Sequence, residues 1–400
     1  MARPRLTRAL AALAMIAGTL IAAQSSTPAA AAPTKVAPAV VPMAVPSVKA
    51  KQIASGGFHS CALTVENRLR CWGNNAYGQL GNGTTTNALD PVQISVLPNV
   101  KAVTAGANHT CALTTDGKVW CWGANFRGEL GNGTTTNASK PVQVAGLKAK
   151  SISGGTSHTC AVTTSGKAKC WGYNLNGQLG NGTTNDSSVP VQVSGLTKKI
   201  KSIAAGGYHS CAVTTSGKVK CWGSNSQGQL GNNKTVSSRV PVSVYKLAAS
   251  TVVKAGLHTT CAITKKAAAK CWGLGIDGQL GNGKLTNSAK PVGVSGLSKK
   301  VKKISIGVSH GCAVLTTGTV KCWGDNFYGQ LGNRTTTSTV VPVTVFGLSK
   351  AAKDIGTGIS SSCAVTKIGG AKCWGYGGLG SLGYGGTADQ VAPVSVTKLY

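Results

Sequence analysis

The sequence predicts an all-β protein: a seven-bladed β-propeller of four-stranded antiparallel blades, with one hairpin disulfide in each blade. Three observations carry this prediction: a long internal repeat, four short strand-like stretches in each copy, and a cysteine pair at the same place in every copy. The repeat is marked by the tripeptide Cys-Trp-Gly, which recurs every 49 to 51 residues and begins at Cys71, Cys121, Cys170, Cys221, Cys271, Cys322 and Cys373. A period of this length is typical of solenoids, arrays and propellers built from one supersecondary unit.

Each repeat alternates apolar and polar residues as β-strands do. In residues 101–144 the stretches KAVTAG, HTCALT, KVWCW and PVQV predict four strands, separated by glycine-rich or Thr/Asp/Gly turns. Seven such sets can close into a ring, which removes most exposed sheet edges. We expect the stretch that begins with proline to be the outer strand, because proline has no N–H to donate to a further neighbour.

The first residues are expected to lie outside the propeller. Three arginines, Arg3, Arg5 and Arg8, precede an apolar run at residues 9–23, and a small-residue tract ends near Ala31. This pattern predicts a secretory signal peptide over residues 1–31, and therefore a secreted, extracellular or cell-wall-associated protein. Residues 32–41, rich in Ala, Pro and Val, predict an extended linker, which leaves residues 42–400 for the propeller.

Both ends of the predicted propeller carry a candidate outer strand. These are PMAV at residues 42–45 and PVSV at residues 393–396. Only one is needed to complete the seventh blade, and the sequence does not choose between them.

The chain is strongly basic. Its 41 Lys and Arg residues and 9 Asp and Glu residues give a formal net charge of +32, which becomes +29 without the three arginines of the signal segment. Such an excess attracts anionic polymers and surfaces. For a secreted protein these are wall polymers or lipid headgroups rather than nucleic acid; the alternative is that the lysines only keep the protein soluble.

The fourteen cysteines form seven pairs, each separated by ten positions: Cys61–Cys71, Cys111–Cys121, Cys160–Cys170, Cys211–Cys221, Cys261–Cys271, Cys312–Cys322 and Cys363–Cys373. Pairing Cys111 with Cys121 places Thr114 opposite Lys118 and leaves a three-residue hairpin loop that ends at Gly117. Counting outward from 114/118 makes 111/121 a non-hydrogen-bonded pair, where Cα atoms approach to about 4.5 Å, within the range of a disulfide. We therefore predict seven cross-strand disulfides.

The third residue of each hairpin loop is expected in the left-handed conformation, as in three-residue hairpins generally. Besides Gly117, the equivalent residues that suit it are Asn67, Gly166, Gly217, Gly318 and Gly369, whereas Ala267 departs from the pattern.

Metal binding is the competing interpretation of the cysteines. His59 and Cys61 resemble a ligand pair, but the chain has no C-x-x-C and every cysteine has a matched partner. The histidines that precede a cysteine by two, namely His59, His109, His158, His209 and His310, are instead expected to bond loop backbone. We expect no metal and no cofactor.

The segment WGNNAYGQLGNG at residues 72–83, together with GGFHSCALT before it, resembles the regulator of chromosome condensation repeat. Copies stand at residues 122–133, 171–182 and 222–233, and a degraded one, WGYGGLGSLGYG, at 374–385. The resemblance extends over nearly the whole chain after the signal segment. It implies a seven-bladed propeller, in agreement with the strand count.

The founding member of that family is a guanine-nucleotide exchange factor for a small nuclear GTPase, so exchange activity is one function that the resemblance implies. Against it, the family's exchange factor inserts an extra hairpin from one blade, and the even spacing here leaves no room for one. A nearer analogy is a secreted bacterial propeller of this family that inhibits β-lactamases, which makes inhibition of a secreted enzyme a further alternative.

Two faces of the predicted ring differ in chemistry. Loops between first and second strands and between third and fourth strands share one face, here called the top face. It is expected to hold the aromatic residues Phe58, Tyr77, Phe126, Tyr173, Tyr208, Phe327, Tyr328 and Tyr376. Aromatic side chains on variable loops of a rigid scaffold are typical of a surface that binds proteins or glycans. The alternative is that several of them pack between blades.

The opposite face, here called the bottom face, holds the hairpins and the links between blades. Its links are rich in lysine, and the candidates for contact with an anionic surface are Lys198, Lys199, Lys201, Lys299, Lys300, Lys302 and Lys303. The tryptophans of Cys-Trp-Gly are expected to pack between blades, because the same placement in every blade argues against a ligand cage.

The sequence shows little catalytic equipment. The nine acidic residues are scattered, there is no G-x-S-x-G segment, and no phosphate-binding loop with a G-K-[ST] ending. A carbohydrate-active enzyme with carboxylates paired across blades stays an alternative. We expect a monomeric, non-catalytic binding scaffold for an unidentified protein partner.

Overall fold

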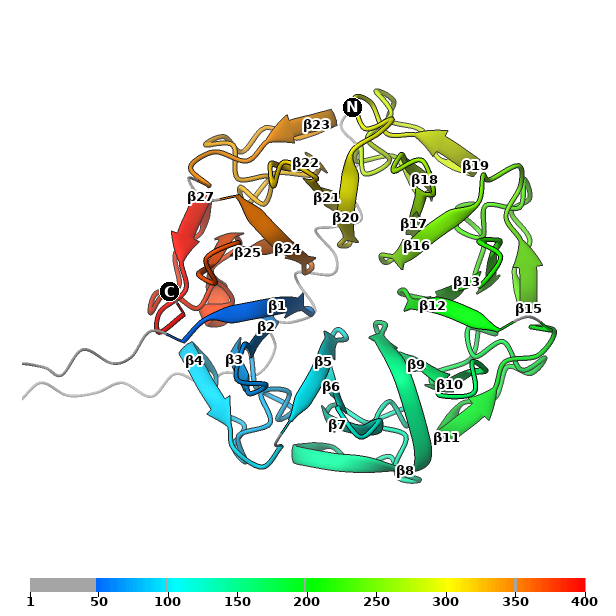
Figure 1. Ribbon diagram of the computed structural model, residues 1–400, viewed down its shortest axis with the longest axis horizontal. Helices are drawn as coiled ribbons and strands as arrows, with labels where there is room; N and C mark the ends of the chain where they lie inside the picture. Colours follow the sequence, from blue (N-terminus) through cyan, green and yellow to red (C-terminus); the bar gives the residue numbers. More distant parts are fainter. Residues whose placement is uncertain (1–47, 98, 198, 349–350, 400) are drawn as a thin grey trace, which may run out of the picture. The chain divides into compact units, whose positions relative to one another are not determined.

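The structure is a computed structural model that describes residues 48–97, 99–197, 199–348 and 351–399. The predicted signal peptide, the linker, the PMAV stretch and Lys198 lie outside the described residues. The described residues form one compact unit. In this unit the strands make seven antiparallel blades arranged in a ring, as predicted (Figure 1). Within the described part of the chain, no helix is both long and apolar enough to span a lipid bilayer.

The innermost strand of each blade faces the centre of the ring (Figure 1). These inner strands are β1 (Ala50–Ser55), β5 (Val100–Ala105), the second part of β8 (Ala138–Gly154), β12 (Ile200–Ala205), β16 (Ser250–Ala255), β20 (Val301–Ile306) and β24 (Ala352–Thr357). The second strands are β2 (His59–Thr64), β6 (His109–Thr114), β9 (His158–Thr163), β13 (His209–Thr214), β17 (Thr259–Thr264), β21 (His310–Leu315) and β25 (Ser361–Thr366).

The third strands carry the Cys-Trp-Gly tripeptide. They are β3 (Leu69–Gly73), β7 (Lys118–Gly123), β10 (Ala168–Gly172), β14 (Val219–Gly223), β18 (Ala269–Gly273), β22 (Val320–Gly324) and β26 (Ala371–Gly375). The outer strands are β4 (Ala88–Ile94), the first part of β8, β11 (Ser187–Gln192), β15 (Ser238–Ser243), β19 (Ser288–Gly293), β23 (Thr339–Thr344) and β27 (Gln390–Ser395). Each outer strand contains the predicted proline, and one short 3-10 helix, η1 (Gly378–Gly380), lies in the last blade.

One strand serves two blades. β8 pairs with β7 as the outer strand of the second blade and with β9 as the inner strand of the third. The link between these blades is the shortest in the chain, which corresponds to the 49-residue spacing from Cys121 to Cys170. With fewer residues the chain passes from blade to blade in an extended conformation, whereas residues 193–197 of a longer link leave the strand geometry and turn.

The C-terminal end of the chain supplies the last strand. β27 pairs with β26, so the PVSV stretch completes the seventh blade, and each blade except for the shared β8 is built from consecutive strands. The ring closes where β24 meets β1: the backbone N–H of Ile53 donates to the carboxylate of Asp354 at 2.9 Å. The indole N–H of Trp72 donates to the carbonyl of Ser381 at 3.1 Å across the same boundary.

The tryptophans of the repeat lie between blades, as predicted. All seven are fully buried, and each packs in a cluster with apolar residues of the preceding blade. Trp122 of the second blade, for example, packs with Leu63, Leu80 and the Cys61–Cys71 pair of the first blade. Its indole N–H donates to the carbonyl of Gln79 at 2.9 Å. The core is therefore distributed over the blade boundaries.

All seven predicted disulfides are present. In each blade the two cysteines face each other across the second and third strands, with Cα atoms 4.0 to 4.1 Å apart. The backbone N–H of Thr64 donates to the carbonyl of Arg68 at 2.9 Å, which closes the first hairpin at the pair expected from the count. No free cysteine occurs among the described residues.

The third residue of every hairpin loop has a positive φ, which confirms the prediction. Six of these residues are glycine or asparagine, but Ala267 adopts φ 57°. A Cβ in the left-handed region costs about 1–2 kcal/mol, and this exceeds the extra chain entropy of glycine. Ala267→Gly should therefore stabilise the protein by about 0.5–1 kcal/mol, measured as a higher denaturation midpoint in guanidinium chloride.

The neighbouring residue provides the control for that change. Ala268 has no positive φ, so Ala268→Gly should destabilise the protein by about 0.5–1 kcal/mol. If both substitutions lower the midpoint, then Ala267 stores no strain in this hairpin.

Candidate binding surfaces

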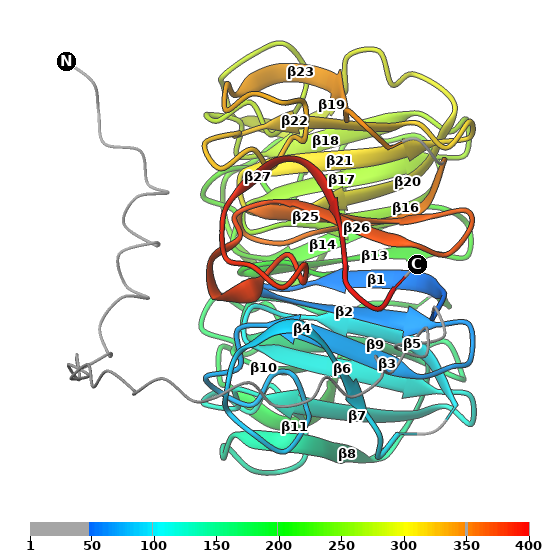
Figure 2. The same ribbon diagram turned by 90° about the vertical axis from the view of Figure 1, so that its left-hand side faces the viewer.

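The top and bottom faces are arranged as the strand order requires. The strands run between the two faces, with the connecting loops at either end (Figure 2). On the top face the long loop between third and fourth strands is held by a buried asparagine. In the first blade the side-chain oxygen of Asn75 accepts the N–H of Leu80 at 2.9 Å, and its side-chain nitrogen donates to the carbonyls of Thr84 and Thr86, both at 3.0 Å. The residue that follows this asparagine is free to differ between blades.

The predicted top-face aromatic residues contact one another from blade to blade. Phe58 packs edge-on against Tyr376 with ring centroids 5.5 Å apart, and Tyr376 packs against Tyr328 at 5.2 Å. Tyr328 in turn contacts Phe327 of its own loop at 4.9 Å. These four residues link the sixth, seventh and first blades. Burial raises the pKa of the Tyr376 hydroxyl, as expected for a ring enclosed by others.

Two further contacts continue this arrangement around the ring. Tyr77 of the first blade packs edge-on against Phe126 of the second, with centroids 5.4 Å apart. Tyr173 of the third blade contacts Tyr208 of the fourth at 6.3 Å. All eight predicted residues thus make aromatic contacts, and five of them are half-buried: Phe58, Tyr173, Tyr208, Tyr328 and Tyr376. Packing between blades is therefore confirmed for these five residues, whereas Tyr77, Phe126 and Phe327 are exposed on the top face and their role in binding stays a prediction.

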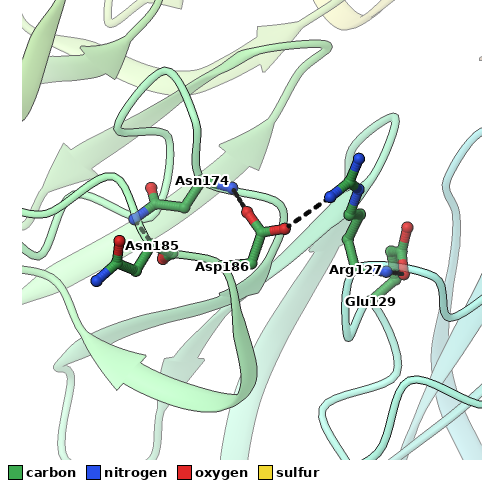
Figure 3. A network of polar contacts seen from close by, with 5 residues as sticks. All are labelled: Arg127, Glu129, Asn174, Asn185 and Asp186. Atoms are coloured by element: carbon green, nitrogen blue, oxygen red, sulfur yellow. Dashed lines mark hydrogen bonds and ion pairs between the residues drawn. The ribbon is translucent and has the colours of Figure 1, made fainter.

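A polar contact joins the second and third blades beside these rings (Figure 3). The guanidinium of Arg127 lies 3.5 Å from the carboxylate of Asp186 and 5.5 Å from the centre of the Tyr173 ring. Asp186 also accepts the backbone N–H of Asn174 at 2.7 Å. Glu129, which stands where most other repeats have glutamine, accepts the N–H of Arg127 at 2.8 Å, and burial raises its pKa. This network orients Arg127 on the top face.

Sequence reasoning missed part of the apolar surface. The residue directly after the buried asparagine, or after its glycine replacement, is a large apolar one in four blades: Phe126 (58% exposed), Leu175 (66%), Ile276 (48%) and Phe327 (60%). Leu175 and Ile276 were overlooked because only aromatic residues were considered. Their equivalence to Phe126 and Phe327 is visible in the repeat itself, since all four stand four positions after the tryptophan.

The bottom face is basic where the structure describes it. Lys199, Lys201, Lys299, Lys300, Lys302 and Lys303 are all exposed in the links and at the adjoining ends of the inner strands. Lys303 also forms an ion pair with Asp354 at 2.5 Å. The others have no ion-pair partner within the described residues, so this face carries uncompensated positive charge.

The histidines hold neighbouring blades together. In the first boundary Nε2 of His59 lies 2.8 Å from the hydroxyl of Thr110 in the next blade. That hydroxyl donates to the carbonyl of Gln79, which also accepts the indole N–H of Trp122. The same contact, at 2.7 to 2.9 Å, recurs at four further boundaries: His109–Thr159, His158–Ser210, His209–Thr260 and His310–Ser362. The expectation that these rings bond loop backbone was therefore wrong, because the partner is a hydroxyl of the neighbouring blade.

These five histidines are neutral at ordinary pH. Burial lowers the pKa of His59, His158 and His209 to about 3. Burial likewise lowers the pKa of His109 and His310 to about 4. Because the hydroxyl hydrogen of Thr110 is used on Gln79, Nε2 of His59 is the donor in this contact. A histidine ring that is buried, neutral and already donating a hydrogen bond to the next blade has a structural role.

The metal interpretation finds no ligand set. All fourteen cysteines are in disulfides and cannot act as thiolate ligands. Across the described ranges, no group of three or more His, Cys, Asp or Glu side chains lies close enough to hold a metal ion.

The fold, the seven disulfides and the two faces together define a class of protein. It is a closed seven-bladed propeller built from a single repeat, in which the loops on one face differ between blades. The regulator of chromosome condensation (RCC1) repeat matches residues 66–113, 116–162, 165–213, 216–263, 271–314 and 317–365. A second description of the same repeat matches residues 50–79, 100–129, 149–178, 200–229 and 301–330. The chain belongs to the RCC1 repeat family.

The chain is also similar to other known proteins and structures. The chain is 33% identical over 206 residues to the ultraviolet-B receptor UVR8 of Arabidopsis thaliana, a match that covers 50% of this chain and 47% of the receptor. The matched region thus spans about half of the receptor's length. In fold the chain is similar to Prp20p of Saccharomyces cerevisiae, with a TM-score of 0.73, 22% identity and coverage of 88% of this chain and 87% of Prp20p. It is also similar to human WBSCR16, with a TM-score of 0.72, 22% identity and coverage of 80% and 87%.

Proposed function

We propose that this protein is a secreted, non-catalytic interaction scaffold that binds a partner protein through the top face of its propeller. One observation carries the proposal: four blades place a large apolar side chain that is 48% to 66% exposed at the same loop position, namely Phe126, Leu175, Ile276 and Phe327. Exposed apolar residues on a rigid frame, with half-buried rings packed beside them, have the character of binding hot spots.

The relatives support a role in binding. Prp20p is described by its binding to Gsp1p and histones, and UVR8 is named as a receptor. Secretion is supported by the signal-like segment in the sequence and is compatible with seven disulfides, which persist in oxidising compartments. We further propose that the basic bottom face attracts an anionic wall polymer or membrane surface, so that the top face points away from it.

The test uses a triple variant of the exposed apolar residues. Phe126→Ser, Leu175→Ser and Phe327→Ser together should weaken partner binding by at least thirtyfold, about 2 kcal/mol, because central apolar residues dominate interface energies. The partner is first captured by cross-linking the native protein to the surface of its own cells. Its affinity for wild type and variant is then measured by calorimetry.

The control variant removes exposed apolar groups from the bottom face. Val65, Val96 and Ile368 are 47%, 58% and 56% exposed, in hairpins and a link. Their joint replacement by serine should leave the affinity unchanged. An equal loss of affinity in both triple variants would rule out the top face as the binding surface.

The same experiment separates the alternatives. A single tight partner with enzymatic activity that is blocked on binding would identify an inhibitor. Guanine-nucleotide exchange is measured by nucleotide release from a small GTPase, and we expect no acceleration, because the repeat spacing leaves no room for an inserted hairpin.

A further inference from the structure

The seven inner strands surround a central channel that contains a cavity of about 150 Å³. A water molecule occupies about 30 Å³ of liquid, so this space holds several waters or one tetrahedral oxyanion. Most side chains that line it are small or carry hydroxyls, among them Ser55, Thr104, Ser153, Ser305 and Thr357. The one charged lining residue is Lys254.

Lys254 stands at an inner-strand position that carries a blade-joining hydroxyl in three of the other six blades and Ala54, Ala204 or Gly356 in the other three. Its equivalents include Thr104, Ser153 and Ser305, each paired like Lys254 with the first cysteine of its own blade. Each of those three hydroxyls accepts a backbone N–H from the next inner strand, at 2.9, 3.0 and 3.2 Å respectively. An ammonium group cannot accept a hydrogen bond, so Lys254 does not make this contact. Among the seven equivalent residues it is the one that places a charge in the channel.

The ammonium group of Lys254 has no hydrogen-bond or ion-pair partner among the residues that the structure describes. Its side chain is reached by solvent, and it lines a cavity whose walls come from all seven inner strands. This enclosure lowers its pKa, and Lys303 acts in the same direction while Asp354 opposes it. An enclosed cation without a partner costs free energy unless an anion joins it.

Further lysines lie at the bottom ends of the inner strands. The second residue of the inner strand is lysine in six blades: Lys51, Lys101, Lys150, Lys201, Lys302 and Lys353. Asp354 is the one acidic residue on the described inner strands, and it is already bonded to Ile53 and Lys303. The bottom ends of the inner strands thus carry like charges that no further acidic residue on these strands compensates, and their field attracts anions toward this side of the channel.

We propose that the central channel binds a compact, multiply charged anion of the phosphate class, with Lys254 as the anchoring cation and the six lysines at the bottom ends of the inner strands as the source of a field that attracts it. The hydroxyls of Thr104, Ser153 and Ser305 provide donors once their hydrogens turn toward the lumen, since each oxygen already accepts an N–H. This site is separate from the top face and does not depend on the proposed partner.

Tripolyphosphate in solution is the probe, and binding is measured by calorimetry at low ionic strength. Lys254→Met keeps the length of the side chain without its charge and should weaken binding about tenfold, the effect of one lost charge-assisted hydrogen bond. Lys101→Gln with Lys201→Gln should weaken binding several-fold and reduce its dependence on salt. Without the anion, Lys254→Met should melt at the same temperature as wild type or higher, which shows that it folds.

The matched control removes the same charge elsewhere on the bottom face. Lys167 and Lys218 are exposed in hairpin loops away from the inner strands, so Lys167→Gln with Lys218→Gln should leave the affinity unchanged. A loss equal to that of the Lys101/Lys201 variant, or an unchanged affinity of Lys254→Met, would overturn the proposal in favour of attraction by net charge alone.

A second arm distinguishes the source of the phosphate. Phosphatidylcholine vesicles containing phosphatidic acid are sedimented with wild type and Lys254→Met. If binding to tripolyphosphate depends on Lys254 and binding to the vesicles does not, the ligand is a free anion. If binding to the vesicles depends on Lys254, the ligand is a lipid headgroup. Independence from Lys254 in both arms rejects the site.

Discussion

Reduction of the seven disulfides should abolish folding. Each disulfide joins two cysteines ten positions apart. Closing a loop of this length lowers the chain entropy of the unfolded state and stabilises the folded state by about 2.5–3 kcal/mol. Seven such contributions exceed the 5–15 kcal/mol that stabilises an ordinary domain. All fourteen sulfurs are fully buried, so a reductant in native buffer should act slowly, and reduction should become rapid only when denaturant opens the blades. After removal of denaturant under reducing conditions, the chain should stay unfolded.

This result is measured by counting alkylated thiols by mass spectrometry and by following tryptophan fluorescence. Replacing one pair, Cys211→Ala with Cys221→Ala, serves as the graded comparison. It should cost about 2–4 kcal/mol and leave a folded propeller with six disulfides. A fully reduced and alkylated chain that melts at the same temperature as the native protein would show that the disulfides do not carry the stability.

Much of this fold could be predicted because a strand register that is worked out for one repeat applies to every blade. The separation of Cys111 and Cys121 determines both the register of one hairpin and the left-handed residue in its loop, since side chains alternate with a period of two. The same register then applies to all seven blades. Ala267 is the instructive case: the register forces its positive φ although alanine disfavours it.

Contacts between blades could not be predicted from the pattern of a single repeat. His59 and Thr110 are 51 positions apart, and nothing in one repeat shows that they meet. A signal was nevertheless present: where the fifth blade has Thr259 in place of the histidine, the sixth has Gly311 in place of the hydroxyl. Both partners are thus missing at this boundary, whereas at the boundary between the seventh and first blades only the histidine is replaced, by Ser361, and the hydroxyl of Ser60 remains.

The candidate binding surface was predicted in part, for a related reason. Loop membership assigned Tyr77 and Phe126 to the top face, but the degree of exposure depends on neighbours from other blades. Tyr328 and Tyr376 are half-buried because they pack on each other, whereas Phe327, which precedes Tyr328 in its loop, is 60% exposed. Exposure of this kind is a property of the closed ring.

Acid should unfold the protein over a narrow range below neutral pH, because five histidines are buried in the neutral form. In the unfolded chain they take up protons near pH 6.5, whereas in the folded chain burial lowers their pKa to about 3 or 4. Stability is therefore complete above pH 6.5 and is lost as pH falls toward 4, since only the unfolded state binds protons there.

Each histidine contributes about 1.4 kcal/mol per pH unit in the middle of that range, so five together reach about 7 kcal/mol per unit. That slope approaches the whole stability of a domain within two pH units. The nine acidic residues are too few to account for a comparable effect. Denaturant midpoints measured between pH 7 and pH 4 by tryptophan fluorescence give the slope directly.

One substitution isolates the contribution of a single boundary. His158→Gln keeps a donor for the hydroxyl of Ser210 but cannot titrate, so it should reduce the slope by about one fifth, about 1.4 kcal/mol per pH unit. His258, which is displaced by one position and only partly buried, is the comparison: His258→Gln should change the slope less. Equal stability at pH 7 and pH 4 in the wild type would mean that the boundaries open to water and accept protons without unfolding, and the histidines would then not clamp the blades.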